Sequence, residues 1–139
     1  MACMPGDQVI DTPSGPKPIK DLRGGDEVIG YDGSVKIATQ VCSYVENPDR
    51  EFFTFTLDDG RSLTVCGNHR IMDIPASEWV VGAKMGDREV KKIDYRTGVS
   101  TSYDLVTEIG GYQIAGIPVN SMIPEMLALT MSLVALKHA

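Results

Sequence analysis

Cysteine is scarce in this chain, and its spacing follows no metal-binding pattern. The 139 residues contain three cysteines, Cys3, Cys42 and Cys66, an odd number without a Cys-x-x-Cys pair. This spacing disfavours both a disulfide framework and a zinc site. We therefore expect no metal and no cofactor, and a reducing compartment, the cytoplasm.

Clusters of basic charge and long apolar runs are also missing. The formal net charge is −6, and basic residues form no group larger than pairs such as Lys91-Lys92, so we expect no nucleic-acid partner. The longest apolar stretch, 126–136, falls short of the ~20 residues that cross a bilayer. The first residues lack a basic segment followed by an apolar one. We expect neither a membrane span nor a signal peptide.

Short runs of alternating or β-branched residues make up most of the chain between residues 8 and 119. With 42% hydrophobic and 23% charged residues, the chain suits a single globular domain. Asp58-Asp59-Gly60 gives the strongest hairpin signal, because glycine readily adopts the positive φ of a tight turn. The pattern predicts an all-β domain, with strands at 8–11, 27–31, 35–43, 51–57, 62–66, 70–74, 89–95, 99–106, 112–115 and 117–119.

Two segments of the predicted β domain resemble each other. Residues 21–28 and 83–90 each contain a Gly-Asp step followed by a valine, with an offset of about 61 residues. Two matching halves of one domain would explain this similarity, and chance is the alternative for so short a match.

After Val119 the pattern changes to that of a helix. Ser121 suits the N-cap, Pro124 and Glu125 the first turn, and Lys137 the last turn. The segment is apolar nearly all round, so it needs a partner surface on more than one side. A groove of the domain, a second copy of the chain and the rest of a larger protein are the three candidates.

Three segments, in this order, carry a family resemblance. Residues 3–28 open with Cys3-Met4-Pro5-Gly6-Asp7 and reach a Gly-Asp step; residues 63–69 end in His69, with Cys66 three positions before it; residues 103–121 close on Asn120-Ser121. Together they resemble the Hint family of inteins, hedgehog autoprocessing domains and bacterial intein-like domains. Cys66 occupies the first position of a motif that resembles the family's Thr-x-x-His. Only 34 residues separate His69 from Asp104, which leaves no room for a homing endonuclease.

The resemblance implies a horseshoe-like all-β Hint fold with pseudo-two-fold halves, followed by a C-terminal helix. It places the autoprocessing domain at 3–120 and a flanking helical segment at 121–139. It also implies a single-turnover reaction of the chain on itself, in which the partners are its own flanking segments, the exteins. Self-association through the tail helix is a further expectation.

The reaction would begin at Cys3. A cysteine side chain can attack the preceding carbonyl carbon, here that of Ala2, and convert the amide into a thioester (an N–S acyl shift). The thiolate is the reactive form, so the fold must lower the pKa of the thiol or supply a base. Asp104 is the candidate base or electrostatic partner if the closing strands lie against the opening one, as the resemblance implies.

The leaving amine needs a proton, and the oxyanion needs hydrogen-bond donors. His69 is the candidate acid, as the only histidine within the predicted β domain. Cys66 or backbone N–H groups near Gly67 are the candidates for holding the oxyanion. The alternatives are structural: a buried small hydrophobe for Cys66, a packed ring for His69 and a turn hydrogen bond for Asp104.

The C-terminal junction departs from the family pattern. Asn120 can cyclise by attack of its side chain on its own carbonyl carbon and release Ser121, which could accept the acyl group from Cys3. The family commonly has a histidine before this asparagine, where this chain has Val119, and another near the aromatic residue of the penultimate strand, where Gly110 and Gly111 precede Tyr112. We therefore expect the Asn120–Ser121 bond to break far more slowly than the Ala2–Cys3 bond.

Two other functions remain open from the sequence. A catalytically weak Hint-like domain could serve as a structural or interaction module, with the tail helix as its contact. An unrelated small β-barrel binding domain is the third reading, and a large separation of Cys3 from Asn120 in the structure would favour it.

Overall fold

The computed structural model describes residues 3–38, 40–45, 50–99 and 101–121. Within these ranges the chain forms β-strands and two 3₁₀ turns, and no α-helix, as the sequence predicts. The strands are β1 (Met4–Pro5), β2 (Val9–Ile10), β3 (Lys17–Pro18), β4 (Glu27–Ile29), β5 (Val35–Ile37), β6 (Gln40–Val45), β7 (Phe52–Leu57), β8 (Ser62–Cys66), β9 (Arg70–Ile71), β10 (Ile74–Pro75), β11 (Lys84–Met85), β12 (Arg88–Arg96), β13 (Thr101–Val106), β14 (Gly111–Ile114) and β15 (Ile117–Asn120). The 3₁₀ turns are η1 (Ile19–Asp21) and η2 (Ala76–Glu78).

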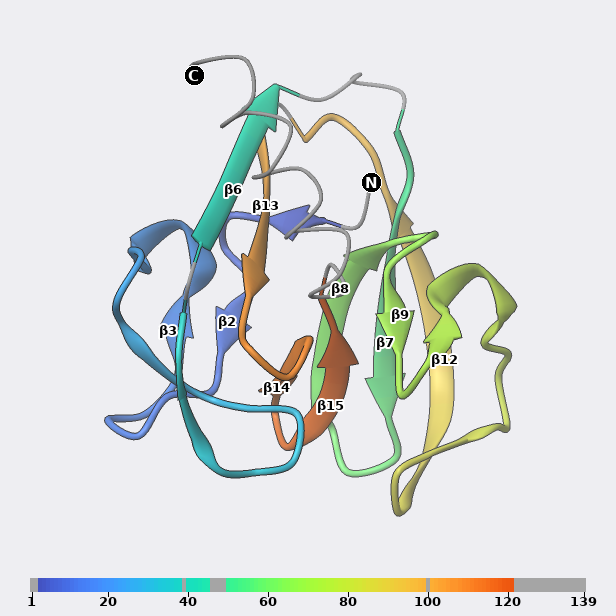
Figure 1. Cartoon of the computed structure of the whole chain (residues 1–139). Helices are drawn as coiled ribbons and strands as arrows, with labels where there is room; N and C mark the ends of the chain where they lie inside the picture. Colours follow the sequence, from blue (N-terminus) through green and yellow to red (C-terminus); the bar gives the residue numbers. More distant parts are fainter. Residues whose placement is uncertain (1–2, 39, 46–49, 100, 122–139) are drawn as a thin grey trace.

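The strands form small antiparallel sheets that curl around one interior (Figure 1). The larger sheets have the orders β1-β13-β6, β10-β9-β15-β14 and β11-β12-β7-β8, and two hairpins, β2-β3 and β4-β5, complete the set. In the first sheet the opening strand β1 pairs with the closing strand β13, with Met4 opposite Tyr103 and Pro5 opposite Ser102. The fold therefore places the opening strand against a strand from the last fifth of the predicted domain.

The β7–β8 hairpin forms at the turn signal in the sequence. Thr56 pairs with Ser62, and Gly60 has a φ of +89° that glycine adopts without strain. Phe55 and Leu63 face each other across the hairpin and are fully buried or nearly so, while Thr54 and Thr64 pair on its other face through their hydroxyls at 2.8 Å. The alternation of apolar and polar residues in the sequence thus becomes a buried and a more accessible face.

One hydrophobic core holds the sheets together. It collects apolar side chains from the opening, middle and closing parts of the domain, among them Ile10, Leu63, Met85 and Leu105, each at most 1% exposed. Tyr112 is the largest of its completely buried side chains. Because such cores lose about 2–5 kcal/mol when a large aliphatic residue is cut to alanine, this cluster provides the main stability of the domain.

The internal repeat exists, but in a different register from the one predicted. Residues 17–28 and 74–85 follow the same course: a two-residue strand that ends in proline, a 3₁₀ turn, a glycine with positive φ and a second strand. Pro18 and Pro75 have nearly equal dihedral angles, and Gly25 (φ +97°) corresponds to Gly82 (φ +92°), 57 positions on. The predicted equivalence of Gly25 with Gly86 was wrong, because Gly86 lies in the turn between β11 and β12.

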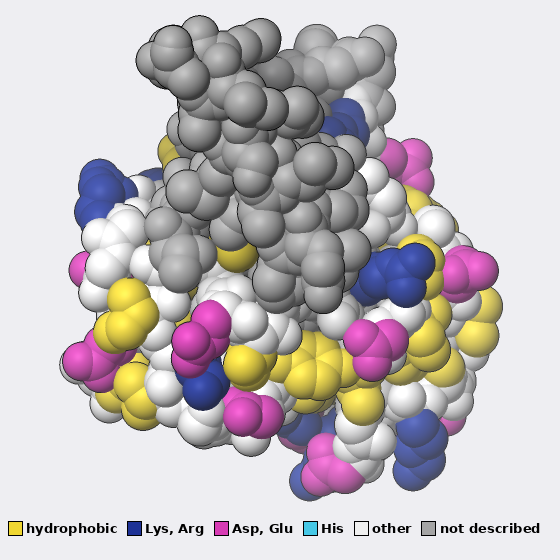
Figure 2. All heavy atoms as spheres, viewed as in Figure 1, with side chains coloured by type: hydrophobic (Ala, Val, Ile, Leu, Met, Phe, Trp, Pro, Cys, Tyr) yellow, Lys and Arg dark blue, Asp and Glu magenta, His cyan; other side chains and the backbone are white. Residues whose placement is uncertain are grey.

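The predicted tail helix lies outside the described residues, so its formation and self-association remain predictions. Among the helical segments that the structure does describe, none has the length and apolar character to cross a membrane. On the face shown in Figure 2, acidic and basic side chains are interspersed between apolar ones.

Candidate active site

Cys3 and Cys66 lie together in a small apolar cluster apart from the main core. Both are completely buried, and Phe52 and Val99 complete the cluster. The backbones of the two cysteines are joined, since the Cys66 N–H donates to the Cys3 carbonyl at 3.0 Å. The Cys3 N–H in turn donates to Cys66 Sγ at 3.1 Å. The Cys3 nitrogen belongs to the Ala2–Cys3 peptide bond, so a thiol sulfur contacts the predicted scissile bond directly.

The surroundings of Cys66 favour its thiolate. The hydrogen bond from the Cys3 side chain lowers the pKa of Cys66 to about 6, against the opposing effect of burial. The Cys3 N–H and the Arg50 guanidinium, whose Nη2 lies 3.4 Å from Cys66 Sγ, add to the lowering. When protonated, Cys66 Sγ can donate to Asn68 Oδ1 at 2.9 Å. Cys66 can therefore hold or release a proton near neutral pH.

His69 lies between the two predicted reaction sites. Its side chain is completely buried, and burial lowers its pKa to about 4. Neither ring nitrogen makes a hydrogen bond of normal geometry to the described residues. The backbone of Asn120 and that of Cys3 nevertheless lie close enough to oppose the lowering of the pKa, as carbonyl groups facing an imidazole N–H would do. The ring is thus neutral at pH 7 and is close to both junctions.

Asp104 is part of a buried pair with Tyr112. The Tyr112 hydroxyl donates to Asp104 Oδ1 at 2.9 Å, and the same oxygen accepts the Leu105 N–H at 2.8 Å. Burial and the charges of Asp104, Cys66 and Cys3 raise the pKa of Tyr112 well above its ordinary value. The hydroxyl therefore remains a donor, and the cysteines are near enough to Tyr112 to contribute to the raised pKa.

Asn120 ends β15 with its side chain bound to the turn between β9 and β10. Its Nδ2 donates to Asp73 Oδ1 at 2.8 Å, and the Asp73 N–H donates to Asn120 Oδ1, also at 2.8 Å. The nitrogen of Ser121, which would leave when Asn120 cyclises, donates to the Gly110 carbonyl at 2.9 Å. Ser121 is buried, and Val119 before it is packed in the main core.

The structure thus groups the site residues that the sequence predicts. Cys3, Cys66 and His69 come together, and Asn120 reaches the same histidine through its backbone. This grouping removes the main support for the unrelated β-barrel reading. Asp104 lies on β13 with the Tyr112 hydroxyl on its Oδ1, and the charges of both cysteines act on that tyrosine.

Three residues of the site were missed by the sequence analysis: Arg50, Asp73 and Tyr112. Tyr112 was identified only as the aromatic of the penultimate strand, and its complete burial together with a hydroxyl is the property that a search for buried polar partners would find. No local sequence signal marks Arg50 or Asp73, whose roles depend on contacts with residues 16 and 47 positions away.

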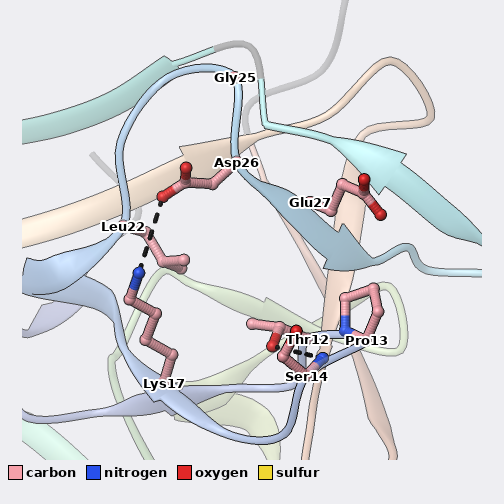
Figure 3. A pocket seen from close by; sticks show the side chains of 8 residues that line it. All are labelled: Thr12, Pro13, Ser14, Lys17, Leu22, Gly25, Asp26 and Glu27. Carbon is pink, nitrogen blue, oxygen red and sulfur yellow. Dashed lines mark hydrogen bonds and ion pairs between the residues drawn. The ribbon is translucent and has the colours of Figure 1, made fainter.

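The pocket in Figure 3 is separate from this cluster. It lies between the β2–β3 turn, with Thr12, Pro13 and Ser14, and the segment that leads into β4, and Lys17 pairs with Asp26 across it at 4.0 Å. A second hollow, beside β1, meets the cysteine cluster at Val99. In the part of the chain that the structure describes, no three His, Cys, Asp or Glu side chains are grouped as metal ligands would be.

The comparison with solved structures gives the fold class directly. A variant of the Ssp DnaB mini-intein matches with a TM-score of 0.68 and 20% identity, over 86% of this chain and 94% of that chain. The DnaB intein from Synechocystis sp. PCC 6803 matches with a TM-score of 0.71 and 19% identity, over 88% and 100%. The gp41-1 intein matches with a TM-score of 0.68 and 16% identity, over 87% and 99%. The chain therefore has the Hint fold of the inteins, as its sequence predicts.

Sequence comparison finds relatives over part of the chain, and no family model matches. Iron–sulfur cluster assembly SufBD family proteins of Mycobacterium bovis and Mycobacterium tuberculosis are 36% identical over 78 residues, 55% of this chain and 9% of those proteins. Warthog protein 6 of Caenorhabditis elegans is 34% identical over 74 residues, 51% of this chain and 12% of that protein. The chain thus spans about a tenth of the length of the curated relatives that it matches.

Proposed function

We propose that this chain is a self-processing Hint domain that breaks the Ala2–Cys3 bond by an N–S acyl shift at Cys3. The observation that carries the proposal is the 3.1 Å contact of the Cys3 nitrogen with Cys66 Sγ in a fully buried pair of cysteines. A buried pair with the pKa of one member lowered to about 6 is arranged for proton transfer near pH 7. The shared fold of the inteins supports the same reaction class.

In the first step Cys66 acts as the base for Cys3. The Cys66 thiolate accepts the thiol proton of Cys3, and Cys3 Sγ attacks the carbonyl carbon of Ala2. A carbon–sulfur bond forms, and the electron pair of the carbonyl double bond moves to oxygen to give the oxyanion.

In the second step the same proton reaches the leaving group. The oxyanion collapses, the carbon–nitrogen bond breaks, and Cys66 returns the proton to the Cys3 nitrogen, its neighbour at 3.1 Å. The products are a thioester on Cys3 Sγ and a free amine. This role differs from the oxyanion role considered for Cys66 from the sequence, and it leaves the oxyanion to backbone N–H groups near Gly67.

His69 and Asp104 support this relay. A neutral His69 ring contributes an N–H donor beside the Cys3 backbone rather than an imidazolium acid, because burial keeps its pKa at about 4. Asp104 acts electrostatically and holds the Tyr112 hydroxyl in place at 2.9 Å. Neither carries the transferred proton.

The thioester can then react in two ways. Water or an added thiol can cleave it, or Ser121 can accept the acyl group, after which Asn120 cyclises and completes splicing. Because no histidine precedes Asn120, the C-terminal step is the slower one, and cleavage dominates over splicing.

Intact-mass analysis of the full chain with and without dithiothreitol or hydroxylamine tests the proposal. These nucleophiles should release Met1-Ala2 from the wild type, and Cys3→Ala should abolish release while its thermal unfolding stays cooperative. Release at an unchanged rate from Cys3→Ala overturns the assignment. A folded wild type that shows no mass change with hydroxylamine would instead favour the interaction-module reading.

A further inference from the structure

The side chain of Asn120 is held by a residue to which no role has been assigned. Asp73 contacts both ends of the carboxamide: its carboxylate accepts from Nδ2 and its backbone N–H donates to Oδ1, each at 2.8 Å. Asn120 is half-buried, and Asp73 is exposed to solvent. The two contacts together fix the orientation of the carboxamide at the junction.

Cyclisation requires the side-chain nitrogen of an asparagine to act as a nucleophile. A carboxamide nitrogen is a poor nucleophile, because its lone pair is delocalised onto oxygen and its protons are weakly acidic. A hydrogen bond to Oδ1 favours the imidate form, in which the nitrogen has lost a proton, and a carboxylate at Nδ2 can take that proton. Asp73 provides both groups: its backbone N–H donates to Oδ1, and its carboxylate accepts from Nδ2.

The strand pairing on either side of the β9–β10 turn holds Asp73 next to Asn120. β9 pairs with β15 through Ile71 and Val119, so the β9–β10 turn extends over Asn120. The turn needs positive φ at Met72 (+48°) and Asp73 (+69°), a conformation that non-glycine residues seldom adopt and that aspartate and asparagine tolerate best.

Two further contacts orient the Asp73 carboxylate and its turn. The Tyr31 hydroxyl donates to Asp73 Oδ2 at 3.1 Å, and Arg70 Nη1 donates to the Asp73 carbonyl at 3.3 Å. Burial, the hydrogen bond to Asp73 and its charge raise the pKa of Tyr31, so this hydroxyl remains a donor. Asp73 Oδ1 is thereby left directed at Asn120.

We propose that Asp73 is the general base for cyclisation of Asn120, in place of the histidine that this junction lacks; the proposal rests on the self-processing function above. Asp73 Oδ1 takes one proton from Nδ2, and Nδ2 bonds to the carbonyl carbon of Asn120. The bond from that carbon to the Ser121 nitrogen breaks, and this nitrogen takes a proton from water. The hydroxide that remains is neutralised by the proton on Asp73, which returns to solvent. The products are a C-terminal succinimide and a free Ser121 amine.

The test is a time course of the full-length chain by mass spectrometry that follows both junctions in one sample. Asp73→Asn keeps the shape, tolerates the positive φ and removes the base, so we expect succinimide formation and release of the Ser121 tail to slow by roughly two to four decades. Thioester formation at Cys3 should stay at the wild-type rate. Asp58→Asn, the same change at an exposed aspartate of the β7–β8 turn, is the matched control and should leave both junctions unchanged.

A second variant separates a base from a structural residue. Asp73→Gly suits the positive φ and opens space beside Nδ2 at an exposed position, so sodium formate should restore tail release in a concentration-dependent manner. A purely structural Asp73 would not respond to formate.

Equal or faster tail release in Asp73→Asn overturns the proposal, since Asp73 would then be a spectator or a restraint. So does a slow Asp73→Gly that formate leaves slow. A wild type that forms the thioester but never releases the tail overturns this proposal together with the C-terminal half of the proposed function, whereas a wild type without thioester overturns the N-terminal half alone.

Discussion

The amide nitrogen of Cys3 and the sulfur of Cys66 are 3.1 Å apart, although 63 positions separate the residues in the chain. This nitrogen must gain a proton when the Ala2–Cys3 bond breaks, and the sulfur belongs to a group whose pKa is lowered to about 6. The intein-like motif at this position resembles Thr-x-x-His, and a threonine hydroxyl would not ionise in this range. The cysteine therefore gives this chain a titratable group at a point where the motif usually has none.

The first prediction is an acid limb in the rate of thioester formation. The pKa of Cys66 is lowered, so its thiolate is present above about pH 6 and is lost as the pH falls through that value. The rate should fall with it, as measured by hydroxylamine-induced loss of Met1-Ala2 across a pH series. Cys66→Ser should be slower by roughly two to four decades and should lack the limb.

Arg50 provides a control for this limb. Its guanidinium helps to lower the pKa of Cys66, so Arg50→Gln should move the limb to higher pH without abolishing the reaction. Arg88→Gln removes a partly exposed arginine that pairs with Asp59 and Asp87 and should leave the limb in place. An identical limb in Cys66→Ser would assign the titration to another group.

His69 should matter at both junctions. Its ring lies beside the backbone of Cys3 and of Asn120, so His69→Ala should slow release of Met1-Ala2 by roughly two to three decades, the scale of losing one positioned hydrogen-bond donor at a reacting group. Release of the Ser121 tail should slow as well. A loss smaller than about threefold at both bonds would make His69 a structural residue.

His69 also makes the stability of the domain depend on pH. The pKa of its buried ring is lowered from 6.5 to about 4, so between these values the unfolded chain binds a proton that the folded chain does not. The free energy of unfolding should fall as the pH drops through this window, by about 3 kcal/mol from this residue. Urea unfolding near neutral pH and near pH 4 measures the difference.

The matching variant for this prediction is His69→Gln, which cannot take up that proton. Its stability should depend less on pH across the same window than that of the wild type. Equal slopes in the two proteins would show that the carboxylates, and not His69, cause the acid sensitivity.

Tyr112→Phe tests the buried pair with Asp104. Phenylalanine preserves the packing but removes the hydroxyl that donates to Asp104 Oδ1 at 2.9 Å, so a buried carboxylate loses one donor. We expect a loss of about 1–3 kcal/mol in the free energy of unfolding. Thr107→Val is the control, because it also removes a buried hydroxyl, one that donates to the Gly111 carbonyl. It should lower the free energy of unfolding by a comparable amount and leave the rate of thioester formation unchanged.

The sequence predicts most of the longer strands well and the shortest ones poorly, but the predicted strand 35–43 is replaced by β5 (Val35–Ile37) and β6 (Gln40–Val45). β8 forms over the predicted residues, because alternation over five positions and a neighbouring Asp-Gly turn specify it locally. β1 and β3 have two residues each, one of them proline, and no period can be read from two positions. They form because other strands offer them hydrogen bonds, which is a property of the whole fold.

In the candidate site, too, residues that depend on long-range contacts cannot be predicted from the local sequence. Cys3, His69 and Asn120 can be identified because a family motif marks them, and the structure places them around one ring. Asp73 cannot, because its turn contains neither glycine nor an Asn-Gly pair, and its partner Asn120 lies 47 positions away. The register of the internal repeat was wrong for a related reason: Gly25 and Gly86 both precede aspartate, but the structural counterpart of Gly25 is Gly82, which alanine follows.

The pairing of β1 with β13 also determines when, during synthesis of the chain, the proposed reaction can begin. A chain leaves the ribosome from its N-terminus, so Cys3 emerges long before Tyr103 opposite Met4 and before Asp104 have been synthesised. Until then the first strand has no partner on that side, and the cysteine pair cannot be enclosed. Long-range pairing of this kind also forms late in folding. Under the proposed mechanism, the peptide bond at Cys3 is thereby protected during synthesis, and the acyl shift can begin only when almost all of the domain has been made.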